Sequence, residues 1–470
     1  MSSSPFCLCL LVVAVALIDR VLCLSSSEFT RRDVLRSSAA ALVTSASTVG
    51  VLLTNDKNYQ RANAVETTTS IDVTGTGTGT YLMPEYYNAP VTAASKGRFY
   101  FPTLTPPFQN RATYRYDLGR DAWTFEQLLT FTNVTATIKT NVIRLKSGGL
   151  WVHSPQWPTG EFCHLLDELG TVEHVVLPCN AFEHAAPVKA FCKKYPKASV
   201  WISPGQYGPF GSCGMSLNEP CKLGYKVDGI FGMDDSNSKI NDSDRDSDND
   251  KSRPPWADEF DYSTLYVSLP ENAGPVSEVA FFHKPTKTLI ATDGVVFIPE
   301  KPSAIFSTYF DEATLSEPNF WPKTVLQSVF LPLRVEDEST STSISTGAYV
   351  YPGYEAIQGR LLRAPILRGF NDSRSPVQTR KWINDISKWQ FDRIITSHFA
   401  SPISATPTDL KAAFAFLGDE PGSAGNQNRG ESALPPIACQ DWELLDGLND
   451  FIATNKIGAP ATFDYKSDCK

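Results

Sequence analysis

Short apolar strands and amphipathic helical segments alternate between residues 141 and 203. Two strands come first, joined by a tight Ser-Gly-Gly turn, and then a helix, a strand, a helix and a strand follow with short connections. The predicted strands lie at 141–145, 150–155, 173–178 and 198–203, and the predicted helices at 159–169 and 185–195. Because strands and helices that alternate directly along a chain pack as layers, this order predicts an α/β domain.

Similar elements continue beyond residue 260 and indicate one long domain at 119–416. A second hairpin is predicted over 277–293, a helix over 377–390 and a strand over 391–398. The chain is 42% hydrophobic and 20% charged, a composition that can bury a sizeable core.

Three segments of different composition surround or interrupt this domain. Residues 65–118 are rich in Thr, Gly, Pro and Tyr and predict a flexible or irregular leader, whereas residues 417–470 form a C-terminal extension. Residues 234–255 are dense in Asp, but they lack the Gly and the Glu that a calcium-binding loop needs at its sixth and twelfth positions. We therefore predict a disordered acidic insertion there.

The charge of the chain bears on its partners. The formal net charge is −9, and no tract is rich in Lys and Arg, which argues against nucleic acid or anionic lipid as the main partner. The apolar stretches near the N-terminus both lie within targeting segments, so no stable membrane span is expected in the mature chain.

Two targeting signals are predicted before residue 65. Residues 6–18 are apolar, too short to span a bilayer comfortably, and end in a small-residue exit, which predicts a secretory signal peptide over 1–23. Residues 24–64 contain an Arg pair, an apolar run and a terminal Ala-Asn-Ala, in that order, which resembles a twin-arginine signal. Together the two signals resemble a tripartite algal presequence, which implies a plastid and its thylakoid lumen. The very short connection between them keeps the stroma and the secretory pathway as alternatives.

The cysteines outside the presequence exclude two kinds of site. Cleavage after Ala64 would remove three of the ten cysteines, and the seven that remain form no C-x-x-C pair, so zinc-finger and thioredoxin interpretations fail. Cys213 and Cys221 flank a short loop, and Cys439 and Cys469 lie in the tail. Each pair could form a disulfide in an oxidising compartment.

The placement of the six histidines is more informative than their number. His184 follows a predicted buried strand, His398 ends another strand, and Asp293 ends a third. Functional groups of layered α/β domains gather where strands end and their loops converge. We therefore expect these three side chains to share one edge of the domain.

Three runs resemble metal-binding segments of metallo-β-lactamase-like hydrolases. Residues 175–184 resemble the strand and loop that carry His-x-His-x-Asp-His, residues 289–293 the strand that ends in the metal-bridging Asp, and residues 394–398 the strand of the last ligand. Longer runs resemble an uncharacterised family with a domain of unknown function from plants, algae and bacteria; they lie at 149–155, 180–184, 255–259, 278–285 and 288–293. The resemblance extends from about Trp123 to Pro402. It implies a metallo-β-lactamase-like αββα sandwich with insertions and no established activity.

The same resemblance implies an incomplete metal site. Cys179 and Ala181 stand where the motif has its first two histidines, so the first metal site has lost most of its ligands. The second site keeps one set of candidate metal ligands, formed by Glu183, His184, Asp293 and His398. His153 and Asn180 are candidates for the second shell around them. Two imidazoles and two carboxylates suit one Zn, Mn or Fe ion, and a water on that ion would be the catalytic group.

Two functions from different classes follow from this set of residues. The first is a mononuclear metal-dependent hydrolase of an ester, thioester or phosphoester in a small or lipid-like substrate. The second is a scaffold or binding protein of the thylakoid lumen that keeps the fold without catalysis and holds no metal. No G-x-S-x-G elbow is present for a serine nucleophile. Cys179 lies close in sequence to His184, but an isolated cysteine after a buried strand is interpreted as a small core residue rather than a nucleophile. His283, next to a predicted turn, is expected at the surface.

Overall fold

The computed structural model describes most of the chain from residue 104 onward. The described residues are 72–73, 80–82, 86–87, 104–131, 134–206, 223–232, 253–268, 275–335, 349–418, 436–455, 459–466 and 469. The predicted presequence at 1–64, the acidic insertion up to residue 252 and the Cys213–Cys221 pair lie outside these residues.

The first half of the domain forms a nine-stranded sheet. Its main path runs β11-β10-β9-β8-β7-β6-β5-β3, and β4 pairs with β6. The strands are β3 (Tyr86–Tyr87), β4 (Leu104–Thr105), β5 (Tyr114–Asp117), β6 (Ala122–Phe131), β7 (Val134–Arg144), β8 (Leu150–His153), β9 (Val172–Leu177), β10 (Ser199–Ile202) and β11 (Gly229–Ile230). Strands β8 to β11 are parallel, and the connections of β8 to β10 carry α3 (Gly160–Asp167), α4 (Phe182–Ala185) and α5 (Val188–Lys194).

The second half forms a seven-stranded sheet in the order β1-β2-β18-β17-β14-β13-β12. Its strands are β1 (Asp72–Val73), β2 (Thr80–Leu82), β12 (Phe260–Ser268), β13 (Pro275–His283), β14 (Thr288–Ile290), β17 (Arg393–Ile395) and β18 (Ile403–Ser404). Only β14 and β17 are parallel neighbours, and the long connection between them carries most of the remaining helices. Those elements are α6 (Glu312–Leu315), α7 (Phe320–Ser328), α8 (Pro352–Glu355), α9 (Pro365–Leu367), α10 (Pro376–Ile386) and the small pair β15 (Val296–Phe297) and β16 (Leu361–Leu362).

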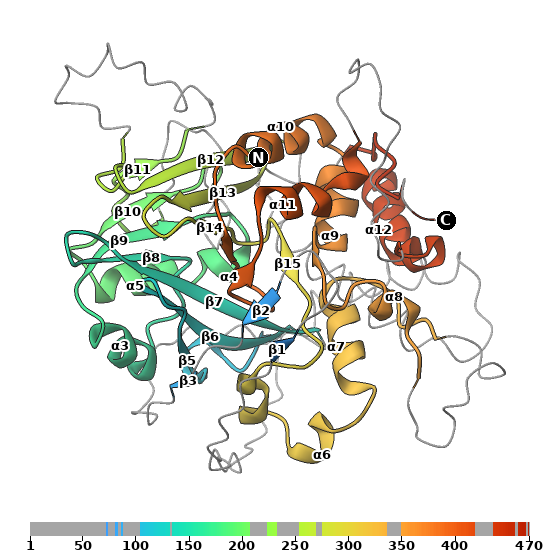
Figure 1. The fold of residues 1–470 in the computed structure, drawn as a ribbon, viewed down its shortest axis with the longest axis horizontal. Helices are drawn as coiled ribbons and strands as arrows, with labels where there is room; N and C mark the ends of the chain where they lie inside the picture. Colours follow the sequence, from blue (N-terminus) through green and yellow to red (C-terminus); the bar gives the residue numbers. More distant parts are fainter. Residues whose placement is uncertain are drawn as a thin grey trace.

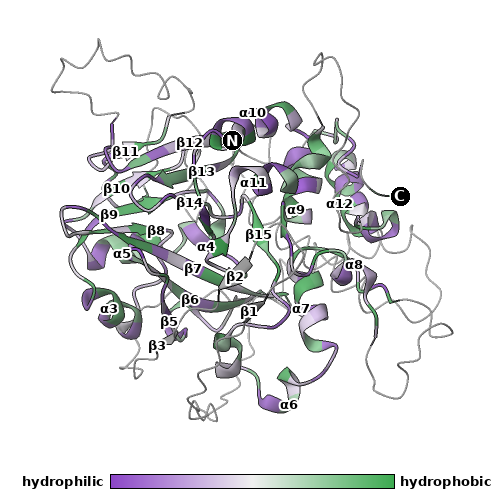
Figure 2. Ribbon diagram, in the orientation of Figure 1, coloured by the Kyte–Doolittle hydropathy of each residue, from purple (hydrophilic) through white to green (hydrophobic). Residues whose placement is uncertain are grey.

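Three apolar clusters define four layers. Trp151 of β8 and Phe281 of β13 lie in the cluster between the two sheets. A second cluster packs α3 and α5 on the nine-stranded sheet, and a third packs α10 and α11 (Pro407–Ala413) on the seven-stranded sheet. Figure 1 shows these helices on opposite sides of the sheets, and Figure 2 shows the hydrophobic colour of β8 in the interior. The chain therefore has a metallo-β-lactamase-like αββα fold.

Residues 65–118 were expected to be irregular, and their described part corrects this expectation. β1 and β2 extend the seven-stranded sheet beside β18, and β3, β4 and β5 pair within the nine-stranded sheet. The aromatic side chains explain why β5 packs, since Tyr114 and Tyr116 are buried in the cluster between the sheets. Short strands at sheet edges have weak sequence signals because only their pairing partners fix them.

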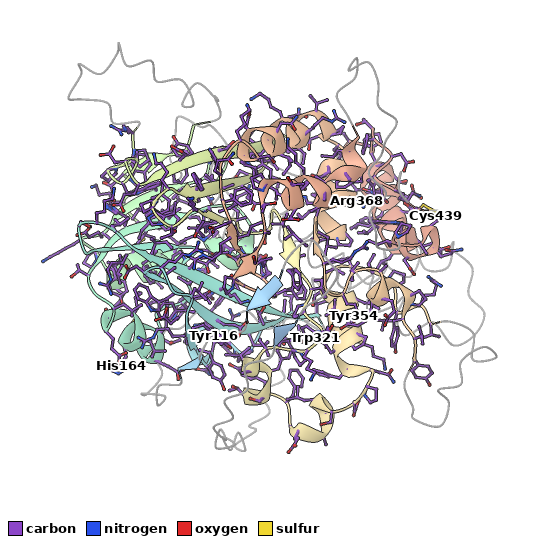
Figure 3. All side chains as sticks on the ribbon, in the orientation of Figure 1. Tyr116, His164, Trp321, Tyr354, Arg368 and Cys439 are labelled. Atoms are coloured by element: carbon purple, nitrogen blue, oxygen red, sulfur yellow. A yellow bond between two sulfur atoms is a disulfide. The ribbon has the colours of Figure 1, made fainter. Side chains whose placement is uncertain are left out.

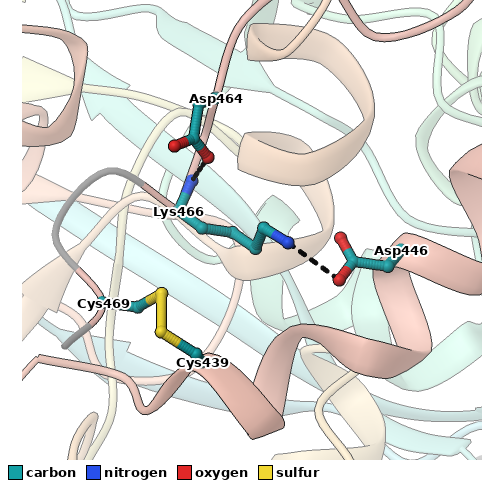
Figure 4. Close-up of a disulfide and its surroundings, with 5 residues drawn as sticks. All are labelled: Cys439, Asp446, Asp464, Lys466 and Cys469. Atoms are coloured by element: carbon teal, nitrogen blue, oxygen red, sulfur yellow. Dashed lines mark hydrogen bonds and ion pairs between the residues drawn. A yellow bond between two sulfur atoms is a disulfide. The ribbon is translucent and has the colours of Figure 1, made fainter.

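The C-terminal residues pack on the long connection of the second half. The guanidinium of Arg368 lies 4.1 Å from the ring centroid of Phe416 and 4.7 Å from that of Trp442, near α12 (Glu443–Thr454) (Figure 3). A disulfide joins Cys439 to Cys469, and Lys466 forms an ion pair with Asp446 of α12 at 2.9 Å (Figure 4). Among the described helices, none is long and apolar enough to cross a bilayer.

Candidate metal centre

The expected ligands come from loops that follow strands of both sheets. Glu183 and His184 lie on α4, directly after β9, whereas Asp293 follows β14 and His398 follows β17. Because β14 and β17 are parallel neighbours, their carboxyl ends lie at the same edge of the seven-stranded sheet. An isolated antiparallel bridge between Cys179 and Glu278 brings the end of β9 to this edge. The four residues therefore meet where the two sheets adjoin.

Three of their ligand atoms form a small triangle. The Nε2 atoms of His184 and His398 are 3.2 Å apart, and Oδ1 of Asp293 lies 2.9 Å from the His398 Nε2 and 3.8 Å from the His184 Nε2. Four ligands at about 2 Å from an ion in tetrahedral geometry lie about 3.3 Å from one another. The triangle thus has the dimensions of three ligand atoms around one ion.

The candidate ligands fall into two overlapping groups of three. One group contains Glu183, His184 and His398, the other contains Cys179, His184 and Asp293, and within each group the ligand atoms lie within 4.8 Å of one another. His184 belongs to both groups. Its side chain is fully buried, whereas those of His398 and Asp293 are 15% and 21% exposed. The site is therefore closed on the side of His184 and open on the side of Asp293 and His398.

Hydrogen bonds on the far side of each imidazole set its orientation. Nδ1 of His398 donates to the carbonyl oxygen of Thr137 at 2.7 Å, so that its Nε2 faces Asp293 and can bind either a proton or a metal ion. Nδ1 of His184 bonds the hydroxyl of Ser154 at 2.5 Å, and the Thr140 hydroxyl donates to the Ser154 carbonyl at 2.8 Å. Such contacts fix the ring and the tautomer of metal-binding histidines.

The backbone is strained at two positions beside these histidines. Ser154 has φ 55° and Phe399 has φ 52°, in the left-handed region that residues with a Cβ rarely adopt. This conformation costs about 1–2 kcal/mol per residue relative to the right-handed one. Ser154 contacts His184, and Phe399 follows His398 directly, so the strain lies where the two rings are positioned. Strain of this kind clusters at functional sites.

Charges in the cluster favour a cation. Burial raises the pKa of the Asp293 carboxyl, but hydrogen bonds to His184 and His398 and the charges of both rings hold that pKa well below its usual range. Burial lowers the pKa of His398, yet the bond to Asp293 and the charges of Asp293 and Glu183 raise it overall. Positive charge is thus stabilised between these side chains, where a divalent ion can replace the imidazole proton.

The buried carboxylate of Glu278 fixes the turn formed by residues 292–294, called here the Asp293 turn. Oε1 of Glu278 accepts the backbone N–H groups of Thr292, Asp293 and Gly294 at 3.0, 3.0 and 2.6 Å. The guanidinium of Arg363 lies 4.0 Å from the other oxygen of Glu278. Burial and the charge of Asp293 raise the pKa of Glu278 to about 7. Glu278 is a positioning residue that the sequence pattern did not single out.

The two candidates for the second shell contact the site differently. Asn180 fixes the loop after β9 to β13, because its amide donates to the Pro275 carbonyl at 2.5 Å and its oxygen accepts the Ser277 N–H at 3.1 Å. His153 is fully buried, and this burial, reinforced by the nearby His184, lowers the pKa of its imidazole to about 3, so the ring is neutral. Among the described residues, neither of its ring nitrogens has a hydrogen-bond partner.

Two histidines outside the cluster occupy unlike environments. His164 is exposed on α3, where it pairs with Glu168 at 3.2 Å (Figure 3). The expectation that His283 lies at the surface was wrong, because it ends β13 with only 2% exposure. Its ring lies 4.6 Å from that of Phe260, and its Nδ1 bonds the Thr286 hydroxyl at 2.8 Å. The residue before a turn still points inward when the alternation of its strand requires it.

The protein is an αββα sandwich that carries candidate metal ligands at the edge where its two sheets adjoin. The chain belongs to the family of the domain of unknown function DUF4336, whose profile matches residues 120–323 and 349–416. No curated protein matches the sequence.

Solved structures with a similar arrangement are distant in sequence. The metal-soaked Flv1 flavodiiron core from Synechocystis sp. PCC6803 has 11% identity and a TM-score of 0.34, with 65% of this chain and 61% of that chain covered. A metallo-β-lactamase from Pontibacter korlensis has 8% identity and a TM-score of 0.30, with 66% and 100% covered. The metallo-β-lactamase FIM-1 from Pseudomonas aeruginosa, in its mono-zinc form, has 7% identity and a TM-score of 0.26, with 46% and 82% covered. The fold assignment rests on the two facing sheets and their outer helices.

Proposed function

We propose that this protein is a mononuclear metal-dependent hydrolase of an ester, thioester or phosphoester. The observation that carries the proposal is the triangle of His184 Nε2, His398 Nε2 and Asp293 Oδ1, whose sides of 2.9 to 3.8 Å suit three ligands of one ion. Glu183 belongs to the same cluster and can complete the ligand set. With Ala181 at one of the motif's histidine positions, that position offers no ligand for a second ion.

The residues of the chain have distinct roles in this proposal. A bound Zn, Mn or Fe ion would lower the pKa of a water molecule and polarise a carbonyl or phosphoryl oxygen. His184 and His398, oriented by Ser154 and Thr137, would hold the ion as neutral ligands, and Asp293 would balance its charge. The exposed fraction lies on the side of Asp293 and His398, which leaves that side for a substrate.

Metal content measured by mass spectrometry tests the proposal. We expect about one ion per chain in the purified full-length protein and its loss in the His184→Ala, Asp293→Ala variant. The matched control is His164→Ala, Glu168→Ala, which removes one imidazole and one carboxylate from an exposed pair on and beside α3. The control should keep its metal. Chromogenic esters, thioesters and phosphoesters are then assayed on the same three samples, and turnover should follow the metal.

A second function is favoured by the lost ligands. Cys179 and Ala181 replace the two histidines expected at these positions, as would happen in a scaffold or binding protein that has abandoned catalysis. In that case the wild-type chain would bind no metal, and the His184→Ala, Asp293→Ala variant would differ from it in neither metal content nor turnover.

We also propose that the protein works in the thylakoid lumen of a plastid. The order of signals in residues 1–64 supports this location, and so does the Cys439–Cys469 disulfide, because disulfides persist in oxidising compartments. A fluorescent protein fused to residues 1–64 should accumulate in the lumen of an algal plastid. Replacing Arg31 and Arg32 by Lys should stop it in the stroma, and secretion of the fusion would contradict the proposal.

A further inference from the structure

Cys179 lies in the metal cluster although its sequence context favoured a core residue. It follows β9 directly, has 2% exposure, and shares a group with His184 and Asp293 in which the ligand atoms lie within 4.8 Å. Its Sγ therefore faces an imidazole and a carboxylate that the proposed function already uses. A buried cysteine with no such role packs among apolar side chains instead.

The backbone around Cys179 is fixed from both sides. Val279 N–H donates to the Pro178 carbonyl at 2.7 Å, and the Gln206 side chain donates to the Cys179 carbonyl at 2.7 Å. The bridge between Cys179 and Glu278 joins the same loop to β13, on which Glu278 also holds the Asp293 turn. The sulfur and the carboxylate are thus positioned by one shared element, as metal ligands need to be.

The other free cysteines of the described residues lie elsewhere. Cys163 is on α3 and Cys192 is on α5, both on the outer face of the nine-stranded sheet. Neither belongs to a group of candidate ligands within the described part of the chain. The position of Cys179 is therefore not a general property of the buried cysteines here, and Cys192 provides a matched control.

Polar side chains beside the cluster lack partners. Within the described residues, both ring nitrogens of His153 and the hydroxyls of Thr292 and Ser397 have no hydrogen bond, and all three side chains are fully buried. Thr292 precedes Asp293, Ser397 precedes His398, and His153 precedes Ser154, whose hydroxyl bonds the His184 ring. Each buried unpaired polar group costs about 1–3 kcal/mol. A further polar or charged group bound in the site would offer these side chains partners.

We propose that Cys179 is a thiolate ligand of the metal ion, and that the site therefore selects zinc over manganese. This inference rests on the proposed metal function and names the ion. Thiolate is a soft donor that suits zinc, whereas manganese prefers carboxylate, carbonyl and water oxygens. The thiol proton passes to solvent when the ion binds, and no electron is transferred. Cys179 stands at a position where the motif has a histidine, and here its sulfur would join His184 and Asp293 around the one ion.

X-ray absorption at the zinc edge tests this ligand without any assay of activity. The zinc-loaded full-length chain should show one sulfur scatterer at about 2.3 Å beside nitrogen and oxygen at about 2.0–2.1 Å. The sulfur should disappear in Cys179→Ser and remain in Cys192→Ser. In competition between zinc and manganese, Cys179→Ser should lose at least about tenfold of the preference for zinc.

The outcomes separate this inference from the proposed function. Bound zinc with nitrogen and oxygen scatterers alone would overturn the thiolate ligand and leave the metal-dependent hydrolase intact. A wild-type chain that binds no metal would overturn both. Because the wild-type spectrum alone decides between these results, the inference is testable even if Cys179→Ser does not fold.

Discussion

Replacing Arg363 by Met removes the centre of a buried ionic network under the candidate site. The guanidinium bonds both oxygens of Asp372 at 2.8 and 3.0 Å and donates to the Gly294 carbonyl at 3.0 Å. The side chains of Arg363 and Asp372 are 1% and 0% exposed. Methionine keeps much of the aliphatic volume but offers neither charge nor donor.

The expected loss in the free energy of unfolding comes from the Asp372 carboxylate, which stays buried without its cation. Of its side-chain partners within the described residues, Asp372 would keep the Thr379 hydroxyl, which donates at 3.0 Å. Removing one partner of a buried ion pair costs about 3–5 kcal/mol. Total stabilities are about 5–15 kcal/mol, so Arg363→Met should remove a large part of the free energy of unfolding. The Arg363→Met, Asp372→Leu double variant should lose less, because the Asp372 carboxylate no longer stays behind unpaired in the interior.

Urea denaturation followed by tryptophan fluorescence measures both changes. The control is Arg120→Met, which removes an Arg–Asp pair at 2.5 Å whose side chains are 48% and 50% exposed. An exposed pair contributes at most about 1 kcal/mol. If Arg363→Met costs no more than the control, or if the double variant is less stable than the single one, burial of an unpaired charge is not the cause of the loss.

Three further predictions follow from other parts of the molecule. Glu278→Ala leaves the three backbone N–H groups of the Asp293 turn without their acceptor. The variant should therefore bind zinc about 10- to 100-fold more weakly in a chelator competition. Unchanged zinc affinity would exclude a positioning role for Glu278. Cys439→Ser opens the loop to Cys469, with a sequence separation of 30, and should lower the free energy of unfolding in urea by about 3–4 kcal/mol. Burial lowers the pKa of His283 to about 4, so its contribution is present above the unfolded pKa of about 6.5 and is lost as the pH falls to 4. His283→Phe should therefore flatten the loss of stability between pH 6.5 and 4, and an unchanged pH profile would show that His283 does not cause that loss.

The sequence predicted the strongly periodic elements near the site. The helix expected at 159–169 is α3, Gly160–Asp167, whose N-cap Thr159 accepts the Phe162 N–H. The strands expected around His153, Leu177 and Ile395 are β8, β9 and β17. Alternating or continuous apolar runs between turn residues carry this information locally. The local sequence does not show how the strands pair or how the two sheets pack, and this arrangement decides which strand ends lie together.

The parts that the sequence missed depend on contacts between distant residues. The local sequence predicts only a small core residue at Cys179, because its role depends on the pairing with β13. It predicts only a strand residue at Glu278, because the contact with the Asp293 turn forms in the folded chain. His283 was expected at the surface because the turn after it dominated its local pattern, but the cluster around Phe260 buries it. Tertiary packing overrides local preference at such positions.

Native mass spectrometry of the full-length protein, supplied with zinc and then dialysed, measures whether the cluster holds one metal ion. We expect a mass shift of one zinc ion per chain, retained in His164→Ala, Glu168→Ala and absent in His184→Ala, Asp293→Ala. A chain that retains no ion would contradict a metal-dependent function. A chain that retains two would contradict the single site that Cys179, Glu183, His184, Asp293 and His398 are proposed to form.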